Sequence, residues 1–470
     1  MDVVISNVEI PQGDRRVPGH ILVQGGKIAG VVSSLDGISA PVVIDGGGKL
    51  ALPGVIDGHV HFNEIVYPDR EDYATGTASA AAGGVTTIVD MPDLPPVRSA
   101  EQFHAKLEAV RGKAVVDYAF WGGATGEDVR EGWTDRIQEL VDLGVCSFKL
   151  YMTPSVPTYP RVDDGEMLFL FEKIGPTGLP IGVHAENFAI VDFLTRKLRA
   201  EGRLEPVAWA EARARIAERT AIQLVIEFSR LTGARAHIVH MSTRDGVELV
   251  RQAKAQGVNI TAETCPHYLY LTAQDAMTRF GAFAKIAPPL RSQEDIDALW
   301  EGLADGSVDF MGTDHAPYVI ATEKQAPGMD IWTSLPGIPA VETLVPFMVS
   351  EGLNKGRLSL SRFVQVLSRA SAVHYGLYPK KGSLEVGADA DVTIVDPQAS
   401  WVVDPARMHT KSKYTPFEGV TLTGQVVKTI VRGQVVYERG RDVVAPRGSG
   451  QFVPRQRTQA LERWLRYGSR

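Results

Sequence analysis

The residues best suited to chemistry in this sequence each close a short apolar segment. His59 and His61 stand two apart after PGVIDG, so on an extended strand both side chains point to one face and can reach one metal ion. Comparable places in SFKLYM, GVHAEN, HIVHMS and MGTDHAP are held by Lys149, His184, His240 and Asp314. One such histidine alone fits a core or surface role equally well. The recurrence of the set predicts metal ligands, because a neutral metal-bound imidazole tolerates an apolar interior.

Lys149 needs a chemical explanation in such a site, since an ammonium group would repel a cation. A lysine buried beside metal ions loses its proton readily, and the neutral amine can take up carbon dioxide to form a carbamate, a carboxylate able to bridge two ions. Two ions bridged in this way lie about 3.5–4 Å apart and share a hydroxide of lowered pKa, which would be the nucleophile. The alternative is a buried lysine paired with an acid.

Asp314 in GTDHAP is the candidate catalytic residue. Its carboxylate could ligate one ion, hold the proton removed from the bridging water and pass it to a leaving nitrogen. The alternative is an N-cap for the following segment. His315, next to Asp314, and His267, in the segment TCPHY, are candidates for supporting a ligand or stabilising an oxyanion. His237 lies three residues before His240, so its ring should face away from the site, and we interpret it as structural.

The elements that must position these residues repeat from about residue 53 to 376. Short apolar strands such as TTIVDM, PIGVHAE and NITAETCP alternate with helical stretches such as ERTAIQLVIEFSRLTG. This alternation predicts parallel βα units, enough for a closed eight-stranded barrel with its active site at the C-terminal ends of the strands. We therefore predict an α/β fold with a (β/α)₈ TIM barrel over residues 53–376.

The two ends of the chain have a different pattern, in which β-branched residues alternate with polar ones. Residues 1–52 and 377–445 are predicted to form one small β-domain jointly, because neither set supplies enough strands for a stable sheet alone. Residues 446–470 form a C-terminal arm. Its Arg, Leu and Trp residues predict an amphipathic contact with a neighbouring subunit, and a solvated tail is the alternative.

Composition sets further limits on function. The chain has 470 residues, is 44% hydrophobic and 22% charged, and carries a net charge of −7, which fits a globular protein and gives no basic footprint for nucleic acid. The N-terminus has no signal-peptide pattern, and no window of about 18 apolar residues predicts a membrane span. We therefore expect a cytoplasmic protein, in which Cys146 and Cys265 are free thiols rather than a disulfide.

Taken in order, these motifs resemble the cyclic amidohydrolases of the amidohydrolase superfamily: hydantoinases, dihydropyrimidinases, allantoinases and dihydroorotases. The match covers nearly the whole chain, from PGVIDGHVHF through GGVTTIVDMP, SFKLYM, VHAEN, HIVHMS, AETCPHYL, APPLRS and GTDHAP to KGSLEVGADADVTIVD and KYTPFEG. The resemblance implies a distorted barrel, a β-sandwich built from both termini, a small cyclic amide substrate, and a homo-oligomer, either tetramer or dimer.

The resemblance also implies a binuclear metal centre. One ion would be held by His59, His61, Lys149 as N6-carboxylysine, and Asp314; the other would be held by Lys149, His184 and His240. Zinc is the usual metal in such enzymes, and manganese or cobalt is possible, because nitrogen and oxygen ligands do not decide between them.

Departures from the family patterns bear on the substrate. Asn63 stands where dihydroorotases commonly place an Arg for the substrate carboxylate, which disfavours dihydroorotate. The segment after HVHFNE lacks the Pro-Gly-Arg of allantoinases, which argues against allantoin. The loop 151–159 looks more like that of hydantoinases, and its apolar character favours an alkyl or aryl substituent over a polar ureido arm. Simple capping of the barrel is the alternative for this loop.

The expected activity is therefore the hydrolysis of 5-substituted hydantoins to N-carbamoyl amino acids. Allantoinase is the alternative, followed by dihydroorotase, cyclic imidase, another two-metal hydrolase class and a non-catalytic scaffold relative. In TSLPGIP, where hydantoinases often have Asn-Gly, backbone atoms are expected to hold the ring. The predicted substrate contacts are Asn63, Met152, Ser155, Val156, Tyr159, His267, Pro336 and Gly337.

Overall fold

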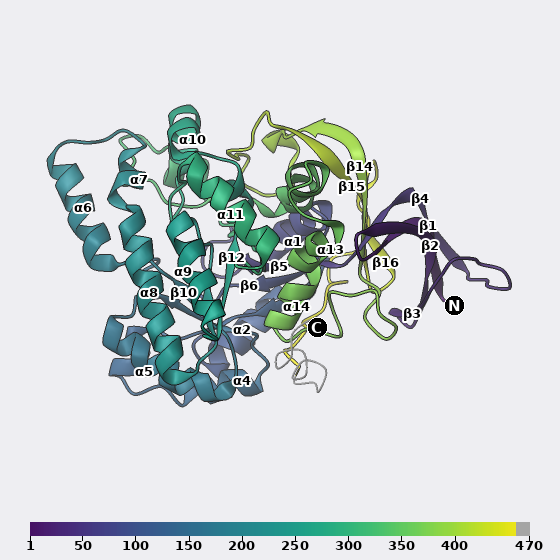
Figure 1. The fold of residues 1–470 in the computed structure, drawn as a ribbon, viewed down its shortest axis with the longest axis horizontal. Helices are drawn as coiled ribbons and strands as arrows, with labels where there is room; N and C mark the ends of the chain where they lie inside the picture. The colour runs from purple at the N-terminus through teal and green to yellow at the C-terminus, as the bar shows by residue number, and fades with distance from the viewer. Residues whose placement is uncertain (457–470) are drawn as a thin grey trace.

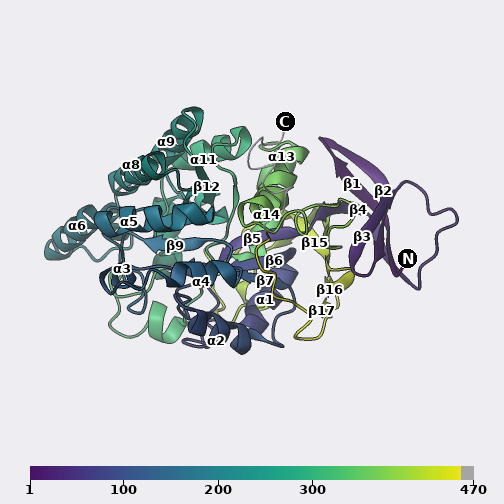
Figure 2. The ribbon, with the colours of Figure 1, turned by 90° about the horizontal axis from the view of Figure 1, so that it is seen from below.

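Parallel strands in chain order form the centre of the protein. The computed structural model describes residues 1–456, and Figures 1 and 2 show these strands inside a layer of helices. One sheet contains β5 (Val55–Val60), β6 (Val85–Asp90) and β7 (Asp117–Phe120). The other contains β8 (Gly122–Gly123), β9 (Phe148–Tyr151), β10 (Ile181–His184), β11 (Ala236–Ile238), β12 (Ile260–Thr264) and β13 (Phe310–Met311). Every pairing within these sheets is parallel, as the sequence predicted.

Two irregular seams join these sheets into a distorted barrel. Trp121 separates β7, which pairs with β6, from β8, which pairs with β9. Its indole Nε1 donates a hydrogen bond of 2.9 Å to the Gly58 carbonyl in the barrel interior. At the other seam Val60 bridges His315, and the His61 amide donates to the His315 carbonyl at 2.9 Å. The predicted closed parallel barrel is confirmed.

The helices cover the outside of the barrel. The longer ones bury one face against the strands: in α9, Val247 and Val250 are buried, and Thr243 caps the helix by accepting from the Gly246 amide. Figure 1 shows α6 on the outer side of α8, furthest from the β-rich end of the molecule. The helices are α1 (Tyr73–Ala82), α2 (Ala100–Val110), α3 (Gly126–Arg130), α4 (Arg136–Asp142), α5 (Asp164–Ile174), α6 (Phe188–Ala200), α7 (Ala208–Ala212), α8 (Arg215–Thr232), α9 (Arg244–Ala255), α10 (Ala273–Phe280), α11 (Gln293–Asp305), α12 (Leu344–Phe347), α13 (Leu360–Val364) and α14 (Ala370–His374).

Strands from both ends of the chain share one eight-stranded sheet, at the right of Figure 1. Its order is β17-β16-β15-β14-β4-β1-β2-β3, and only the β1–β4 pairing is parallel. The two halves meet where Val392 on β14 pairs with Pro53 on β4. The bounds are β1 (Val3–Gln12), β2 (Arg15–Gln24), β3 (Lys27–Val32), β4 (Val42–Pro53), β14 (Val392–Val402), β15 (Thr421–Val431), β16 (Gln434–Glu438) and β17 (Asp442–Val443).

A buried ion-pair network ties the barrel to this sheet. The Lys381 ammonium lies 2.5 Å from the Asp117 carboxylate at the start of β7, 2.7 Å from that of Asp391 and 2.9 Å from that of Asp389. Arg432 forms a second ion pair with Asp117. The three carboxylates are almost inaccessible to water, so the ammonium that they share neutralises charge that water cannot screen.

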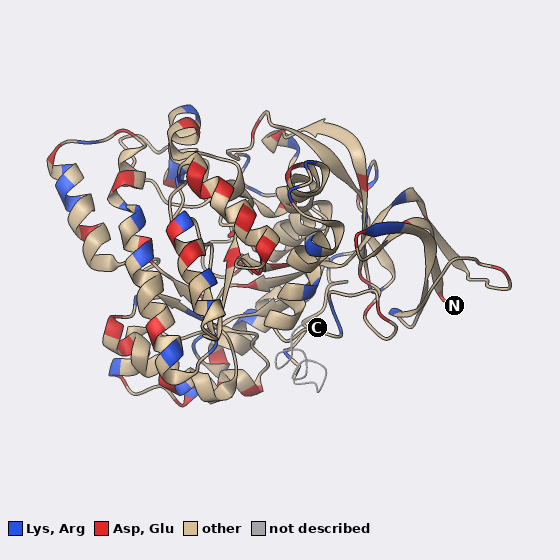
Figure 3. Cartoon of the chain, in the orientation of Figure 1, with Lys and Arg blue, Asp and Glu red and all other residues tan. Residues whose placement is uncertain are grey.

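Several other predictions can be compared with the structure. Cys146 and Cys265 are free and buried, as predicted. Across residues 1–456 no helix is long and apolar enough to span a membrane. Acidic and basic residues are interspersed along the outer helices in Figure 3. Part of the predicted C-terminal arm, residues 457–470, lies outside the described residues. The described part of the arm, up to residue 456, runs beside β7, where Phe452 packs against Tyr118, Phe120 and Phe103.

Candidate active site

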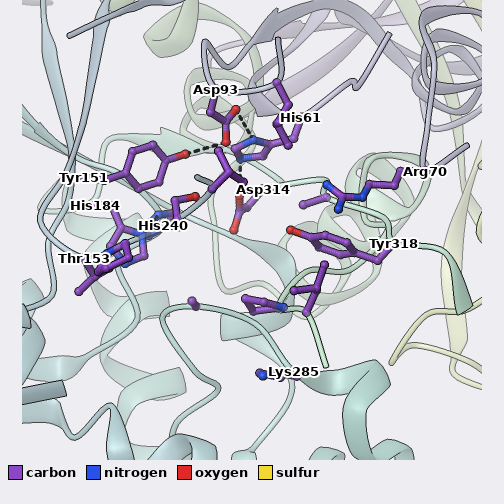
Figure 4. Close-up of a pocket in the computed structure, with 18 of the residues that line it drawn as sticks. His61, Arg70, Asp93, Tyr151, Thr153, His184, His240, Lys285, Asp314 and Tyr318 are labelled. Atoms are coloured by element: carbon purple, nitrogen blue, oxygen red, sulfur yellow. Dashed lines mark hydrogen bonds and ion pairs between the residues drawn. The ribbon is translucent and has the colours of Figure 1, made fainter. Parts of the chain in front are cut away.

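A cavity of about 400 Å³ opens at the C-terminal ends of the barrel strands. The predicted ligands all line it, and Figure 4 shows several of them from different strands directed towards one another. Asp314 Oδ1 lies 3.1 Å from both His59 Nε2 and His61 Nε2, and His184 Nδ1 lies 3.1 Å from His240 Nε2. The structure therefore brings together residues that are separated by up to 255 positions in the sequence.

Carboxylates behind the histidines fix which ring nitrogen faces the cavity. His59 Nδ1 contacts Glu263, His61 Nδ1 donates to Asp93 Oδ1 at 2.9 Å, and His184 Nε2 donates to Glu186 Oε2 at 2.7 Å. Each carboxylate leaves the second ring nitrogen of its histidine for a ligand, an arrangement common in metal sites.

Charges around Glu186 and Asp314 keep these two carboxyl groups ionised. Burial alone would raise the pKa of Glu186, but Arg213 and His184 outweigh burial and lower that pKa to about 2. In the same way, His59 and His61 hold the pKa of Asp314 well below its usual value against the effect of burial. Asp314 also has a positive φ of 51°, a conformation rare for a residue other than glycine, and it caps no helix in the described chain.

Unsatisfied nitrogens show that the residues fit a metal centre. Among the described residues, His240 Nδ1 and Lys149 Nζ are buried without a hydrogen-bond partner, and His59 Nε2 lies 3.1 Å from Asp314 Oδ1 without the geometry of a hydrogen bond. The ligand atoms of His59, His240 and Asp314 lie within 4.8 Å of one another. A buried nitrogen without a partner is costly unless something binds it, and divalent ions take histidine, carboxylate and carbamate donors of this kind. The family resemblance implied the same ligands.

Lys149 forms no ion pair with an acid within residues 1–456, so the pairing considered from the sequence is not realised there. Its Nζ lies 4.8 Å from the centre of the Tyr151 ring. Burial lowers the pKa of Lys149 to about 8, and Asp314, Glu263 and Asp93 oppose only part of that shift. Near neutral pH an appreciable fraction of this amine is therefore unprotonated, the form that reacts with carbon dioxide.

The other three histidines named from the sequence do not line the cavity. His315 Nδ1 accepts hydrogen bonds from the Ala340 and Val341 amides, so this ring holds the chain that follows the last barrel strand. His267 is fully buried behind the site, where burial lowers its pKa to about 3. His237 bonds to Thr261 Oγ1 at 2.9 Å, which agrees with a structural role.

The structure separates the residues expected to contact substrate into two groups. Asn63, Ser155, Val156 and Pro336 line the cavity, whereas Met152, Tyr159 and Gly337 do not. Tyr159 was expected in the wall, but its hydroxyl donates to the Lys149 carbonyl at 2.7 Å from behind the strand. Met152 faces the core because Tyr151, its neighbour, takes the cavity side of the extended chain.

Gly337 also differs from expectation. Its amide donates to the Lys285 carbonyl at 2.8 Å, and its carbonyl accepts from the Tyr414 hydroxyl at 2.9 Å. Both backbone groups are therefore already used within the protein. Of the two predicted contacts Pro336 and Gly337, only Pro336, which has no amide hydrogen, lines the cavity.

Sequence reasoning missed several residues that line the cavity. Tyr151 could have been found, because it lies two residues after Lys149 and shares its strand face. Trp209 lies in the short helix α7 and Trp332 in the irregular segment after β13, and their ring centroids lie 6.5 Å apart. Lys285 places its ammonium 3.9 Å above the Trp209 ring and donates to the Ile331 carbonyl. No local pattern marks these three, since their proximity depends on loop conformation.

Comparison with known sequence families shows which family this chain belongs to. The sequence model of the amidohydrolase family matches residues 50–436. The chain belongs to the amidohydrolase family. This amidohydrolase is 37% identical to the L-hydantoinase of Paenarthrobacter aurescens, with 98% of this chain and 99% of the relative aligned. It is 38% identical to the allantoinase of Rubrobacter xylanophilus, with 97% of this chain and 98% of the relative aligned.

Solved structures give the same result for this amidohydrolase. The L-hydantoinase (dihydropyrimidinase) from Arthrobacter aurescens matches with a TM-score of 0.91 at 37% identity, over 97% of this chain and all of that one. The barrel fold and the β-rich domain expected from the resemblance are thereby confirmed. The chain is a cyclic-amidohydrolase relative along its whole aligned length.

Proposed function

We propose that this amidohydrolase opens 5-substituted hydantoins at the bond between the C4 carbonyl and N3, giving N-carbamoyl amino acids. The observation that carries this proposal is the arrangement of the cavity, in which the histidine, lysine and aspartate cluster shares one space with an apolar, aromatic wall. That wall contains Trp209, Trp332, Val156, Pro157 and Leu335. The likeness to an L-hydantoinase supports the same substrate class.

The family and the donor set support two divalent ions in this site. His59, His61, Asp314 and Lys149 as N6-carboxylysine would hold one, and Lys149, His184 and His240 would hold the other. Zinc is our first choice, with manganese or cobalt as alternatives. Such ions, when bound, polarise the carbonyl under attack and activate a water molecule.

Asp314 moves the proton in this proposal. It is ionised and lies between the first two histidines, so it can accept the proton of the attacking water. It then delivers that proton to N3 as the C4–N3 bond breaks. Tyr151 lines the cavity and donates its hydroxyl hydrogen to Asp93 at 3.1 Å in this structure; it is our candidate donor to the C4 oxygen once that hydrogen turns from Asp93 to the substrate.

The aromatic wall would bind the C5 substituent. An aryl or alkyl group placed against Trp209 and Trp332 leaves water without burying a polar group, which contributes about 2 kcal/mol for a phenyl-sized substituent. Asn63 is neutral and so provides no cation for a carboxylate. Its amide also donates to the His61 carbonyl at 3.1 Å. Dihydroorotate is accordingly a poor candidate.

Allantoin is the second candidate substrate, favoured by the 38% identity to an allantoinase and by the polar side of the cavity. Arg70, Thr153 and Ser155 line that side and could pair with a ureido arm. Arg70 is, however, held by two nitrogens on the Glu323 carboxylate, so fewer of its donors remain for a ligand.

A substrate panel tests the proposal on metal-reconstituted protein. Hydantoin, 5-benzylhydantoin, dihydrouracil, allantoin, dihydroorotate and a cyclic imide are compared by kcat/KM. We expect 5-benzylhydantoin to be opened fastest. Turnover of allantoin with both hydantoins inert would make allantoin, and not a hydantoin, the first candidate substrate. We also infer from the family resemblance a cytoplasmic homo-oligomer, a tetramer or dimer, which sedimentation velocity can check.

A further inference from the structure

The cavity wall formed by Ser334–Pro336, together with Gly337 behind it, has no backbone donor left for a substrate. The Ser334 amide donates to the Asp330 carbonyl at 3.0 Å, the Leu335 amide to the Glu323 carbonyl at 2.9 Å, and the Gly337 amide to the Lys285 carbonyl at 2.8 Å. Pro336 has no amide hydrogen. A hydantoin ring has two carbonyl oxygens, so a donor for the oxygen away from the site of attack has to come from a side chain.

Tyr318 has a hydroxyl in the required place. It lines the cavity, and Figure 4 shows the hydroxyl directed towards Asp314, on the opposite side of that residue from Tyr151. Within residues 1–456 no hydrogen bond involves this hydroxyl. The hydroxyls of Tyr151 and Tyr414, by contrast, are bonded to Asp93 and to the Gly337 carbonyl.

The Tyr318 ring is held firmly from several directions. Its amide donates to the Tyr414 hydroxyl at 3.2 Å, and its carbonyl accepts from Ser412 Oγ at 2.7 Å. The Arg70 guanidinium lies 4.6 Å from the ring centre, and Glu323 fixes that guanidinium. A donor fixed in advance costs little to reorganise when charge develops on the substrate.

We propose that Tyr318 is a further catalytic residue, which donates a hydrogen bond to the C2 carbonyl oxygen next to the departing nitrogen. This inference rests on the proposed function. When the C4–N3 bond breaks, its electron pair goes to N3 and spreads onto the C2 oxygen. The water supplies hydroxide to C4 and, through Asp314, a proton to N3, so the atoms and charges balance. A hydrogen bond at the C2 oxygen strengthens as this charge develops and so favours bond breaking.

The hydroxyl stays protonated under working conditions. Burial raises the pKa of Tyr318, and the nearby Asp93, Glu323 and Asp314 add to this, while Arg70 opposes it. Tyr318 therefore acts as a neutral donor and not as a base. The C-terminal motif KYTPFEG also gains a role, because its Tyr414 holds both Tyr318 and Gly337.

The test combines Tyr318→Phe with a change of the substrate atom. A 5-substituted hydantoin and its 2-thio analogue are compared, because sulfur is a weaker hydrogen-bond acceptor than oxygen. We expect Tyr318→Phe to lower kcat/KM about tenfold to a hundredfold for the oxygen substrate. For the thio substrate, Tyr318→Phe should lower kcat/KM about threefold at most, because the sulfur forms only a weak hydrogen bond with the Tyr318 hydroxyl. Loss of packing alone would lower both values equally.

Controls separate this inference from the proposed function. Tyr270→Phe removes the hydroxyl of a tyrosine that is 37% exposed and outside the cavity, and it should leave both rates unchanged. Metal content and thermal unfolding show whether each variant is folded and loaded. If Tyr318→Phe does not fold, Tyr414→Phe provides the same comparison and should show a smaller loss in the same direction. Equal losses on both substrates would overturn the role of Tyr318 alone. A wild-type protein inactive on every cyclic ureide would overturn the proposed function as well.

Discussion

Asp93 Oδ1 lies 2.9 Å from His61 Nδ1, so a carboxylate from the loop after β6 fixes the orientation of a candidate ligand at the end of β5. The same carboxylate accepts from the Tyr151 hydroxyl through its other oxygen at 3.1 Å. One side chain thus orients a predicted metal ligand and a predicted substrate donor. Burial would raise the pKa of Asp93, but His61 outweighs it and lowers that pKa to about 2, so the carboxylate is ionised.

Replacing Asp93 should weaken metal binding more than it disturbs the fold. Asp93→Leu removes the acceptor for His61 Nδ1–H and should lower metal affinity about tenfold to a hundredfold. Asp93→Asn keeps an oxygen acceptor and should lose less. Elemental analysis after dialysis against a graded chelator measures the difference. Equal retention of metal by both variants and the wild type would show that Asp93 does not support metal binding.

Asp314 provides the sharpest test of the proton path. Asp314→Asn keeps an oxygen for a metal ion but cannot accept the proton, so kcat should fall about 10²–10⁴-fold while metal content persists. The measurement pairs steady-state kinetics with metal analysis of the same sample. A variant that keeps nearly full kcat would show that another group is the base.

The aromatic wall predicts selective loss with bulky substrates. Trp332→Ala should lower kcat/KM for 5-benzylhydantoin about tenfold, because one wall of the substituent site is removed, and should change unsubstituted hydantoin little. Trp133→Ala, at an exposed indole outside the cavity, is the matched control. Parallel losses on both substrates would point to general damage to the site.

Lys381 predicts a large effect on stability. Lys381→Met leaves Asp117, Asp389 and Asp391 buried without their shared ammonium, which should cost about 3–5 kcal/mol of unfolding free energy. Lys27→Met removes an exposed ion pair to Asp389 and should cost about 1 kcal/mol at most. Denaturant unfolding of both variants provides the comparison, and similar costs would contradict the assigned role.

His409 predicts a pH dependence of stability. Burial would lower its pKa, but Glu342 and Asp442 outweigh burial and raise that pKa to about 9. The folded protein therefore binds this proton more tightly than the unfolded chain does. The stabilisation is complete below about pH 6.5, the value for an unfolded histidine, and is lost as pH rises towards 9. Thermal unfolding of wild type and His409→Gln from pH 6 to 9.5 should converge at the alkaline end; a constant difference would refute this assignment.

The sequence could predict the candidate ligands because strand period and barrel topology determine where such residues meet. His59 and Lys149 lie in the buried strands β5 and β9, His240 follows β11, and parallel strands bring their C-terminal ends to one face. The failures have the same kind of physical cause. Met152 was misjudged because the apolar composition of its loop was weighed above the alternation that turns it away from Lys149 and Tyr151. Tyr159 lies further along, where the chain is no longer a strand and alternation gives no guide.

Contacts between loops were outside the reach of sequence patterns. Trp209 and Trp332 meet only because each indole donates to a distant carbonyl, that of Ile286 and that of Arg203. The Tyr318 hydroxyl could not be recognised as unpaired before its surroundings were known. The seam at Trp121 was equally hidden, since the strand it interrupts reads as one continuous apolar segment.

The pairing of β4 with β14 has a consequence for biosynthesis. Val392 pairs with Pro53 across about 340 residues of chain. The edge of β4 that pairs with β14 therefore has no partner until most of the protein has left the ribosome. At a synthesis rate of about 5–20 residues per second that interval is roughly 20–70 s. During this time an apolar strand edge is open to wrong partners, and chaperone protection of the nascent chain would matter most for this segment.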